Sequence, residues 1–236
     1  PTAVITDAKT RHKYTMNDFV LIPAHCVLDY RTTRSLPQHI AATTGVDALT
    51  HAVEAYIGRT TYKKTRKDCE NAVKLIFGNI EKAVFEKEET ALENMLIASH
   101  KAGRAFSRSY VGYIHAVSHS LSGKYNMPHG LTNAVIMPWV LEKYGKKVYN
   151  KLAKLALVAG IGNKGMPKDK LAKLFIEEIR KLNKKLGIPQ KLEGIKAEDI
   201  PEMAKYADKE GNPLYPVPIL WDAKELEQIY YDVMER

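Results

Sequence analysis

The sequence is poor in cysteine and contains no long apolar run. Only Cys26 and Cys69 carry thiols, and they form no CxxC pair, which gives no support to a disulfide framework or a thiolate metal site. We expect both thiols to be buried or inert. No stretch approaches the roughly 20 apolar residues of a membrane span, and no signal-peptide pattern opens the chain. We therefore expect a cytoplasmic protein without a membrane partner.

A compact basic run with interleaved aromatic residues is also missing, although the net charge is +9. Lysine and arginine are spread over stretches such as residues 168–185, where acidic residues alternate with them. Solvated helix faces explain this charge, so we expect no nucleic-acid partner. The hydrophobic content of 45% allows a sizeable core and excludes a disordered chain.

Apolar residues at helical spacing dominate the chain after residue 35. Pro37 is typical of a helix entry, and we expect a short helix that ends near Thr44, then Gly45 as a break, then a helix that stops at Gly58. Helical periods recur over residues 72–84, 91–106, 146–159, 168–186, 197–208 and 222–234.

The first 35 residues have a different pattern. Residues 3–6 and 18–29 are rich in β-compatible side chains, and we expect a short strand in each. No other strand-rich region and no repeat period is present. The sequence therefore predicts a mainly α protein, with a strand-bearing segment over residues 1–35 and an all-α domain over residues 36–236.

The segment GIGNKG at residues 160–165 matches the letters of a dinucleotide-binding loop. That fingerprint requires a preceding strand and an immediately following helix N-terminus, which present backbone amides to a pyrophosphate. The preceding residues, KLAKLALVA, have a helical period instead. We expect a glycine-capped helix end followed by a loop.

Histidines gather in one stretch, GYIHAVSHSLSGKYNMPHGL, which holds His115, His119 and His129. The first two stand four apart and share one face of a helix. Earlier in the chain, Asp47 and His51 have the same spacing within GVDALTHAVEAY. Two helical faces with these side chains, and a third imidazole past a turn, predict a site for a divalent transition metal.

The donor types narrow the choice of metal. One carboxylate and several imidazoles without thiolate suit iron(II), zinc, manganese, cobalt or nickel, and disfavour copper(I) and calcium. Spacing alone does not choose among these ions. It also leaves open which of His115 and His119 is a ligand, since both lie on one helical face.

These two motifs, together with the segment SLPQHIAATTGVD and the approach ITDAKTRHKY, resemble the iron-containing, group III alcohol dehydrogenases over nearly the whole chain. The resemblance implies a multi-helix, dehydroquinate-synthase-like C-terminal domain. It implies metal ligands at Asp47, His51, His115 and His129, from the family patterns D-x-x-x-H and H-x-x-x-H-x9-H.

The resemblance further implies an NAD- or NADP-dependent enzyme in which the metal, as Lewis acid on the alcohol oxygen, favours hydride transfer to nicotinamide. His119 would lie near the nicotinamide and the substrate oxygen, where its imidazole could pass a proton to solvent. Lys13, in RHKY, matches a lysine near the cofactor. The implied substrate is a small alcohol or aldehyde.

The family's nucleotide-binding domain, of roughly 150 residues, has no counterpart in this sequence, and neither does its GGGS-type phosphate loop. Residues 1–35 would then be a residual strand segment of that domain, and residues 36–236 the metal-binding catalytic domain. A split protein with the nucleotide domain as a separate chain, a truncated product, and a free-standing module are all compatible with this, as is a homo-oligomer.

Three functions follow from the sequence. The first is the metal-bearing part of an alcohol dehydrogenase, and the second is a non-catalytic metal-binding or assembly module derived from that family. A metal-dependent hydrolase is the third. A module that only binds metal has no chemical use for His119 beside the ligands, which favours the enzyme.

Overall fold

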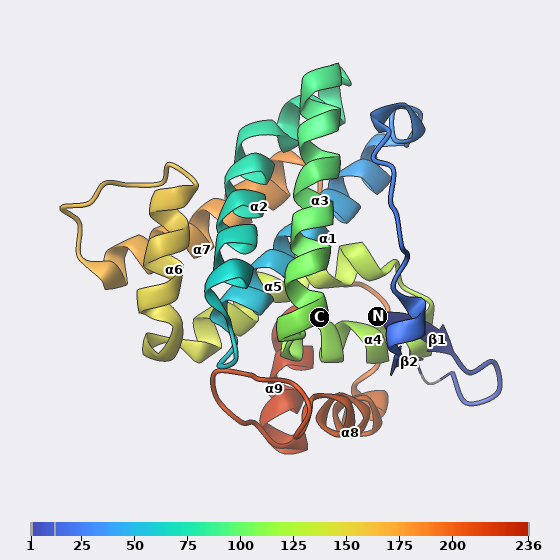
Figure 1. The fold of residues 1–236 in the computed structure, drawn as a ribbon. Coiled ribbons are helices and arrows are strands. Elements are labelled where there is room, and N and C mark those ends of the chain that lie inside the picture. Colours follow the sequence, from blue (N-terminus) through green and yellow to red (C-terminus); the bar gives the residue numbers. More distant parts are fainter. Residues whose placement is uncertain (1, 12, 236) are drawn as a thin grey trace.

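The computed structural model describes residues 2–11 and 13–235, so Pro1, His12 and Arg236 are outside the description. As the apolar periodicity predicts, the protein is mainly helical (Figure 1). The α-helices are α1 (Gln38–Ile57), α2 (Lys63–Glu81), α3 (Glu89–Ser109), α4 (Tyr113–Tyr125), α5 (His129–Tyr144), α6 (Lys146–Val158), α7 (Lys168–Lys185), α8 (Ile200–Gly211) and α9 (Ala223–Val233). In this part of the chain no helix is long and apolar enough to cross a membrane.

Helices α1, α2 and α3 pack against one another, and α4 packs against α5 and α8 (Figure 1). The spacing of apolar residues explains the first group, because Ala72, Val73, Ile76 and Ile80 place one face of α2 in the core, and all four are buried. Burial of such side chains is the main favourable contribution to folding. Helices α6 and α7 form a pair on the other side of α2.

The expected break at Gly45 is wrong, because α1 continues through it as one helix. A Cβ atom at Gly45 would lie 2.8 Å from Ile80 Cδ1 and 3.1 Å from Met95 Cε. Gly45 thus allows α1 to approach α2 and α3 closely, and these contacts outweigh the weak helix propensity of glycine. The predicted stop at Gly58 is confirmed.

Of the two expected strands, the first is confirmed as β1 (Thr2–Thr6), but the second is wrong. Strand β1 pairs antiparallel with β2 (Lys13–Asn17), from Thr2 opposite Asn17 to Thr6 opposite Lys13. Residues 18–29 contain only a 3₁₀ turn, η1 (Phe19–Leu21). The side chain of Asp18 caps this turn by accepting the Val20 N–H. The short connection after β1 fits a hairpin with the nearer segment, and it leaves residues 18–29 without a partner strand in the described part of the chain.

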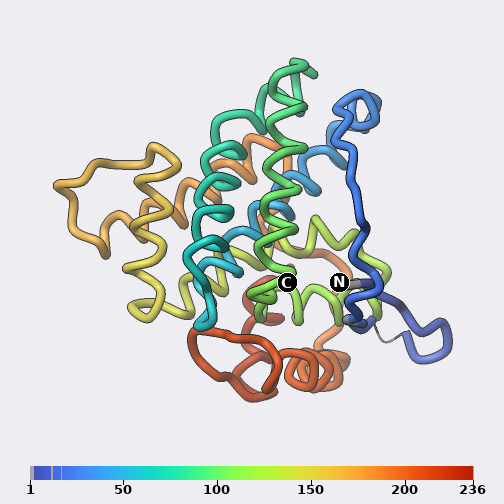
Figure 2. The backbone as a smooth tube through the Cα atoms, in the orientation of Figure 1, coloured from blue at the N-terminus to red at the C-terminus, as the bar shows by residue number. Residues whose placement is uncertain are grey.

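Residues 18–37 run from the hairpin along the helical body to the start of α1 (Figure 2). Most of their apolar side chains face solvent, with Phe19 at 85% and Val27 at 90% exposure. Cys26 is exposed as well, whereas Cys69 is buried as expected. Burial raises the pKa of the Cys69 thiol to about 12.

The GIGNKG segment is a loop, in agreement with the sequence. Helix α6 ends at Val158, and Gly160 and Gly162 take positive φ angles of 78° and 71°. The next helix, α7, begins only at Lys168, so no helix N-terminus follows the glycines directly. Shorter elements complete the chain: η2 (Tyr30–Thr32), the π-helical turn η3 (Lys82–Glu86) and η4 (Ala197–Asp199).

Candidate functional site

The predicted site residues come from three helices that meet in the core. Helix α1 contributes Asp47 and His51, α4 contributes His115 and His119, and α5 begins at His129. The connection between α4 and α5 reverses sharply, with Asn126 in the left-handed conformation at φ 55°. This reversal returns the third imidazole of the stretch to the first two.

Asp47 lies at the centre of the cluster. Its carboxylate is 3.8 Å from His115 Nε2, 3.9 Å from His129 Nε2 and 4.0 Å from His51 Nδ1. One donor atom each of Asp47, His51 and His115 lies within 4.8 Å of the others. His119 is adjacent, with its ring stacked on that of His129 at a centroid distance of 4.9 Å. Spacing left His115 and His119 equivalent, and the structure places His115 in the group around Asp47.

Two glycines allow these helices to come together. A Cβ at Gly130 would lie 2.8 Å from the carbonyl oxygen of Thr43, so α5 approaches the backbone of α1 directly. A Cβ at Gly123 would clash with the carbonyl of Arg11, so the hairpin approaches α4 in the same way. The first approach sets His129 against Asp47, and the second brings Lys13 to the site.

Glu54 holds His115 and was missed by the sequence analysis. Its carboxylate oxygens pair with His115 Nδ1 at 2.6 Å and accept the Ile114 N–H at 2.9 Å. Burial raises the pKa of Glu54, and the backbone N–H groups that it accepts oppose this rise. A signal did exist, because Glu54 follows Asp47 by seven residues and His51 by three, and so shares their helical face.

Glu210, on α8, holds His119 and was also missed. Its Oε1 lies 2.6 Å from His119 Nδ1 and accepts the Tyr215 hydroxyl at 2.6 Å. Burial and the charge of Glu210 raise the pKa of Tyr215 well above its usual value, which keeps this hydroxyl protonated. Sequence offers no signal for Glu210, because the pair is 91 residues apart.

His129 is oriented by its own neighbours. Its Nδ1 lies 2.9 Å from Ser118 Oγ, which in turn lies 2.5 Å from Thr132 Oγ1. Asn133 donates to Asp47 Oδ1 at 2.6 Å and also lies 3.0 Å from His129 Nε2. The carboxylate and the imidazole are therefore fixed with respect to each other before any ion binds.

Burial keeps the clustered imidazoles neutral. It is the largest cause of the lowered pKa values of His51, His115 and His129, and the neighbouring imidazoles lower the pKa of His115 further. A neutral imidazole has a free lone pair, which is the form that binds a metal.

The cluster fits a divalent transition metal. His115 Nδ1 is hydrogen-bonded to Glu54. The other ring nitrogen, Nε2, is buried, lies 3.8 Å from Asp47 Oδ1 and has no hydrogen-bond partner. A buried polar atom without a partner is costly, and an ion at this position would satisfy it. Asp47, His51 and His115 lie within reach of one ion, and His129, whose Nε2 is 3.9 Å from Asp47, would complete a set of one carboxylate and three imidazoles that suits iron(II), zinc or nickel.

Lys13, at the start of β2, is half-buried beside the cluster. Loss of solvation lowers its pKa, and the charges of Asp47 and Glu210 oppose that change. Its ammonium group is thus near both the proposed ligand and the partner of His119. The predicted contact of Lys13 with a cofactor stays a prediction.

A cavity of about 780 Å³ opens onto the cluster, and its wall includes His51, His115, His119 and His129. Phe106, Tyr110 and Val111 line the next part of the wall. Phe106 stacks on His51 at a centroid distance of 4.4 Å. Buried and half-buried imidazoles in the wall of an open cavity are accessible to a small ligand.

Residues 41–234 match the Fe-containing alcohol dehydrogenase family, C-terminal part. A 1,3-propanediol dehydrogenase of Citrobacter freundii is 37% identical over 96% of this chain and 59% of its own length. Lactaldehyde reductase of Escherichia coli (strain K12) is 34% identical, over 86% of this chain and 54% of its own length.

A crystal structure of 1,3-propanediol oxidoreductase superposes with a TM-score of 0.92 and 34% identity, over 99% of this chain and 62% of that chain. The chain therefore spans less than two thirds of the length of these relatives. The match confirms both the fold expected from the sequence and the resemblance carried by its motifs. This chain belongs to the iron-containing alcohol dehydrogenase family, to whose C-terminal part it corresponds.

Proposed function

We propose that this chain forms the metal-bearing part of an NAD- or NADP-dependent alcohol dehydrogenase or aldehyde reductase. Asp47, His51, His115 and His129 would hold the divalent ion, which is iron(II), or zinc or nickel in its place. The observation that carries this proposal is the meeting of three imidazoles around the Asp47 carboxylate, together with the unpartnered Nε2 of His115. When bound, the ion supplies Lewis acidity to an alcohol or carbonyl oxygen, and the nicotinamide accepts or returns hydride.

His119 is the proposed proton carrier. With Nδ1 held by Glu210 at 2.6 Å, the ring is fixed and its Nε2 can accept or release a proton at the cavity, since the ring lines its wall. Tyr215 orients Glu210 from its other side. This arrangement has no use in a non-catalytic metal-binding module, which is the second candidate function.

Lys13 would contact the nicotinamide end of the cofactor, because the hairpin sets it at the edge of the same cluster. The exposed apolar side chains of residues 19–28 would be covered by a nucleotide-binding domain, within the same polypeptide or as a separate chain. Several exposed apolar side chains within one short segment are typical of an interface. The hairpin edge also offers unpaired backbone groups to a further strand.

Metal binding is the first test of this proposal. The chain loaded with zinc or iron(II) should hold about one ion, and Asp47→Ala and His129→Ala should each lose most of it. His119→Ala should retain the ion, and His39→Ala, a histidine at the exposed start of α1, is the matched control. Retention of metal by Asp47→Ala would refute the ligand assignment.

Activity is the second test. The chain mixed with a nucleotide-binding domain from a relative should oxidise 1,2-propanediol, 1,3-propanediol or butanol with NAD or NADP. His119→Ala should lower turnover by about 10²- to 10⁴-fold, the usual contribution of general acid-base catalysis. Full metal occupancy with no turnover in the mixture would favour the non-catalytic module.

A further inference from the structure

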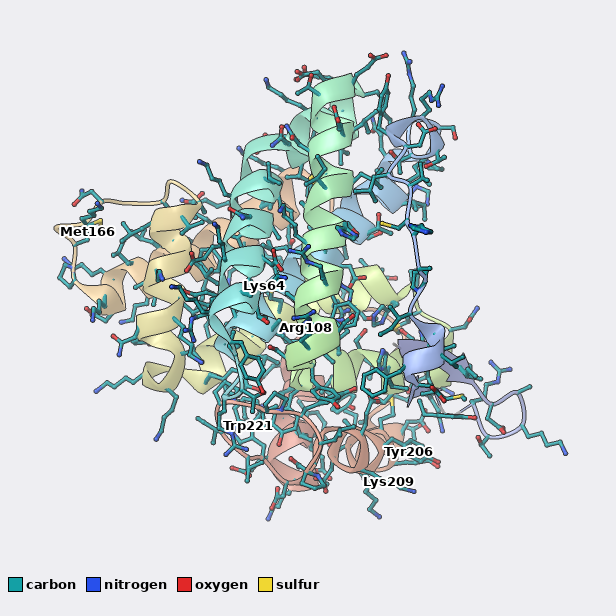
Figure 3. The ribbon with its side chains drawn as sticks, in the orientation of Figure 1. Lys64, Arg108, Met166, Tyr206, Lys209 and Trp221 are labelled. Carbon is teal, nitrogen blue, oxygen red and sulfur yellow. The ribbon has the colours of Figure 1, made fainter. Side chains whose placement is uncertain are left out.

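The outer end of the cavity is lined by two cationic side chains. Lys64, in the first turn of α2, and Arg108, in the last turn of α3, both belong to its wall. Figure 3 labels them on these neighbouring helices. Both are exposed, and neither forms an ion pair with a carboxylate in the described part of the chain. Two cations without a counter-ion at one cavity mouth attract an anion.

The first turn of α2 carries positive charge, whereas a helix N-terminus is stabilised by negative charge. Its N-cap, Tyr62, makes no side-chain capping bond, and the first turn contains no acidic residue. Lys63 and Lys64 occupy that turn instead, where the helix dipole disfavours positive charge. The first backbone N–H groups of a helix have no partner within it, so an anion at this end would gain both the dipole and the cations.

A third, independent feature is the buried hydroxyl of Thr65. Thr65 is 2% exposed, lines the same cavity, and its Oγ1 has no hydrogen-bond partner. The usual local partner is the carbonyl four residues earlier, as for Thr50, which donates to Val46 O at 3.0 Å. At Thr65 the equivalent carbonyl, that of Thr61, accepts Arg66 Nη1 instead. Thr65 thus brings an unpaired buried hydroxyl to the cavity wall, and a ligand oxygen that reached it would supply the missing partner.

The rest of the wall does not neutralise these groups. Phe106, Tyr110 and Val111 line the wall along with the imidazoles and the cations. Asp18 is the single carboxylate in the described wall, and it already accepts the Val20 N–H. A ligand that reaches from the imidazoles to Lys64 and Arg108 would thus meet apolar walls and then positive charge.

We propose that this end of the cavity binds an anionic group of the substrate. The substrate class is a hydroxy acid, or the corresponding aldehyde, with a carboxylate, sulfonate or phosphate at the end remote from the reacting carbon. Lys64 and Arg108 bind the anion, and Thr65 donates its hydroxyl to it. This inference rests on the proposed function for the identity of the reacting end, whereas the anion site itself does not depend on the metal.

The first experiment uses the metal-free chain and inorganic phosphate, with binding followed by NMR titration at low ionic strength. The double variant Lys64→Gln/Arg108→Gln should weaken phosphate binding at least tenfold, and Thr65→Val should weaken it while Thr65→Ser restores it. Lys147→Gln/Lys164→Gln removes the same charge from exposed residues outside the cavity and should leave binding within twofold. Equal loss in the control, or no loss in the double variant, would overturn the site.

The second experiment uses the metal-loaded chain and compares 4-hydroxybutanoate, 3-hydroxypropane-1-sulfonate and glycerol phosphate with neutral 1,4-butanediol. At least one anion should bind ten times more tightly than the diol, and the double variant should remove that preference. The ranking of the three anions identifies the anionic group. Equal binding of anions and diol by a fully metal-loaded chain would overturn this inference and leave the proposed function intact.

The remaining outcomes are also decisive. A chain that binds no metal but binds phosphate through Lys64 and Arg108 would refute the proposed function and support the anion site. If NAD, and none of the hydroxy acids, competes with phosphate and loses affinity in the double variant, the site belongs to the cofactor and the substrate inference fails.

Discussion

Replacement of Glu54 by glutamine should weaken metal binding, although Glu54 is not a proposed ligand. Its two carboxylate oxygens serve His115 Nδ1 at 2.6 Å and the Ile114 N–H at 2.9 Å. Glutamine has one oxygen for these two donors. If the amide NH₂ faces Nδ1 instead, the ring must carry its proton on Nε2, the atom proposed to bind the metal.

The expected size follows from this choice. Loss of an outer-shell partner of a ligating histidine commonly lowers metal affinity by about 10- to 100-fold. Because glutamine also favours the wrong tautomer, we expect the upper end, about 100-fold or roughly 2.7 kcal/mol. The fold itself should tolerate the change, since a buried carboxylate is replaced by a neutral side chain of the same shape.

Zinc affinity by competition with a chromogenic chelator measures the effect, and the thermal midpoint of the metal-free variants checks folding. Glu210→Gln is the matched control, because Glu210 makes the same 2.6 Å contact to Nδ1 of His119. It should retain affinity within about threefold, well under the 10-fold loss that an outer-shell change produces. Equal losses in both variants, or no loss in Glu54→Gln, would refute the assignment of His115 as the ligand.

Three further predictions concern stability and reactivity. Free zinc at 1,000 times its dissociation constant should stabilise the fold by about 4 kcal/mol and raise the thermal midpoint by roughly 8 to 16 °C. A thermal midpoint that does not change when a chelator removes the zinc would contradict a metal site built from three helices. Gly130→Ala should lower the free energy of unfolding by about 1 to 3 kcal/mol, because the added methyl group meets the Thr43 carbonyl. Gly103→Ala, which has open space around the added methyl group, should raise the free energy of unfolding by up to about 1 kcal/mol. Denaturant unfolding measures both changes. At pH 8 a thiol reagent should modify exposed Cys26 and spare Cys69, whose pKa burial raises to about 12, until the chain is unfolded.

Helix periodicity was predictable because it is a local property. Apolar spacing identified most helices to within a few residues, and the i, i+4 pairs placed Asp47 with His51 and His115 with His119. The two errors came from non-local contacts. Gly45 stays helical because Ile80 and Met95 pack onto it, and the second strand forms where the turn after β1 allows pairing, not where apolar residues are densest.

By itself the sequence determined the family, the mainly α fold and the donor types of the proposed metal site, since these depend on residue identity and short spacings. Only the tertiary structure decided which helices meet, and it places His115 beside Asp47 and His51, a choice that spacing left open and that the family resemblance implied. It also decided that Glu54 and Glu210 hold the two rings, and that Lys64 and Arg108 share a cavity wall with them. Distances between residues on separate helices depend on the packing of the whole chain, and no local pattern encodes them.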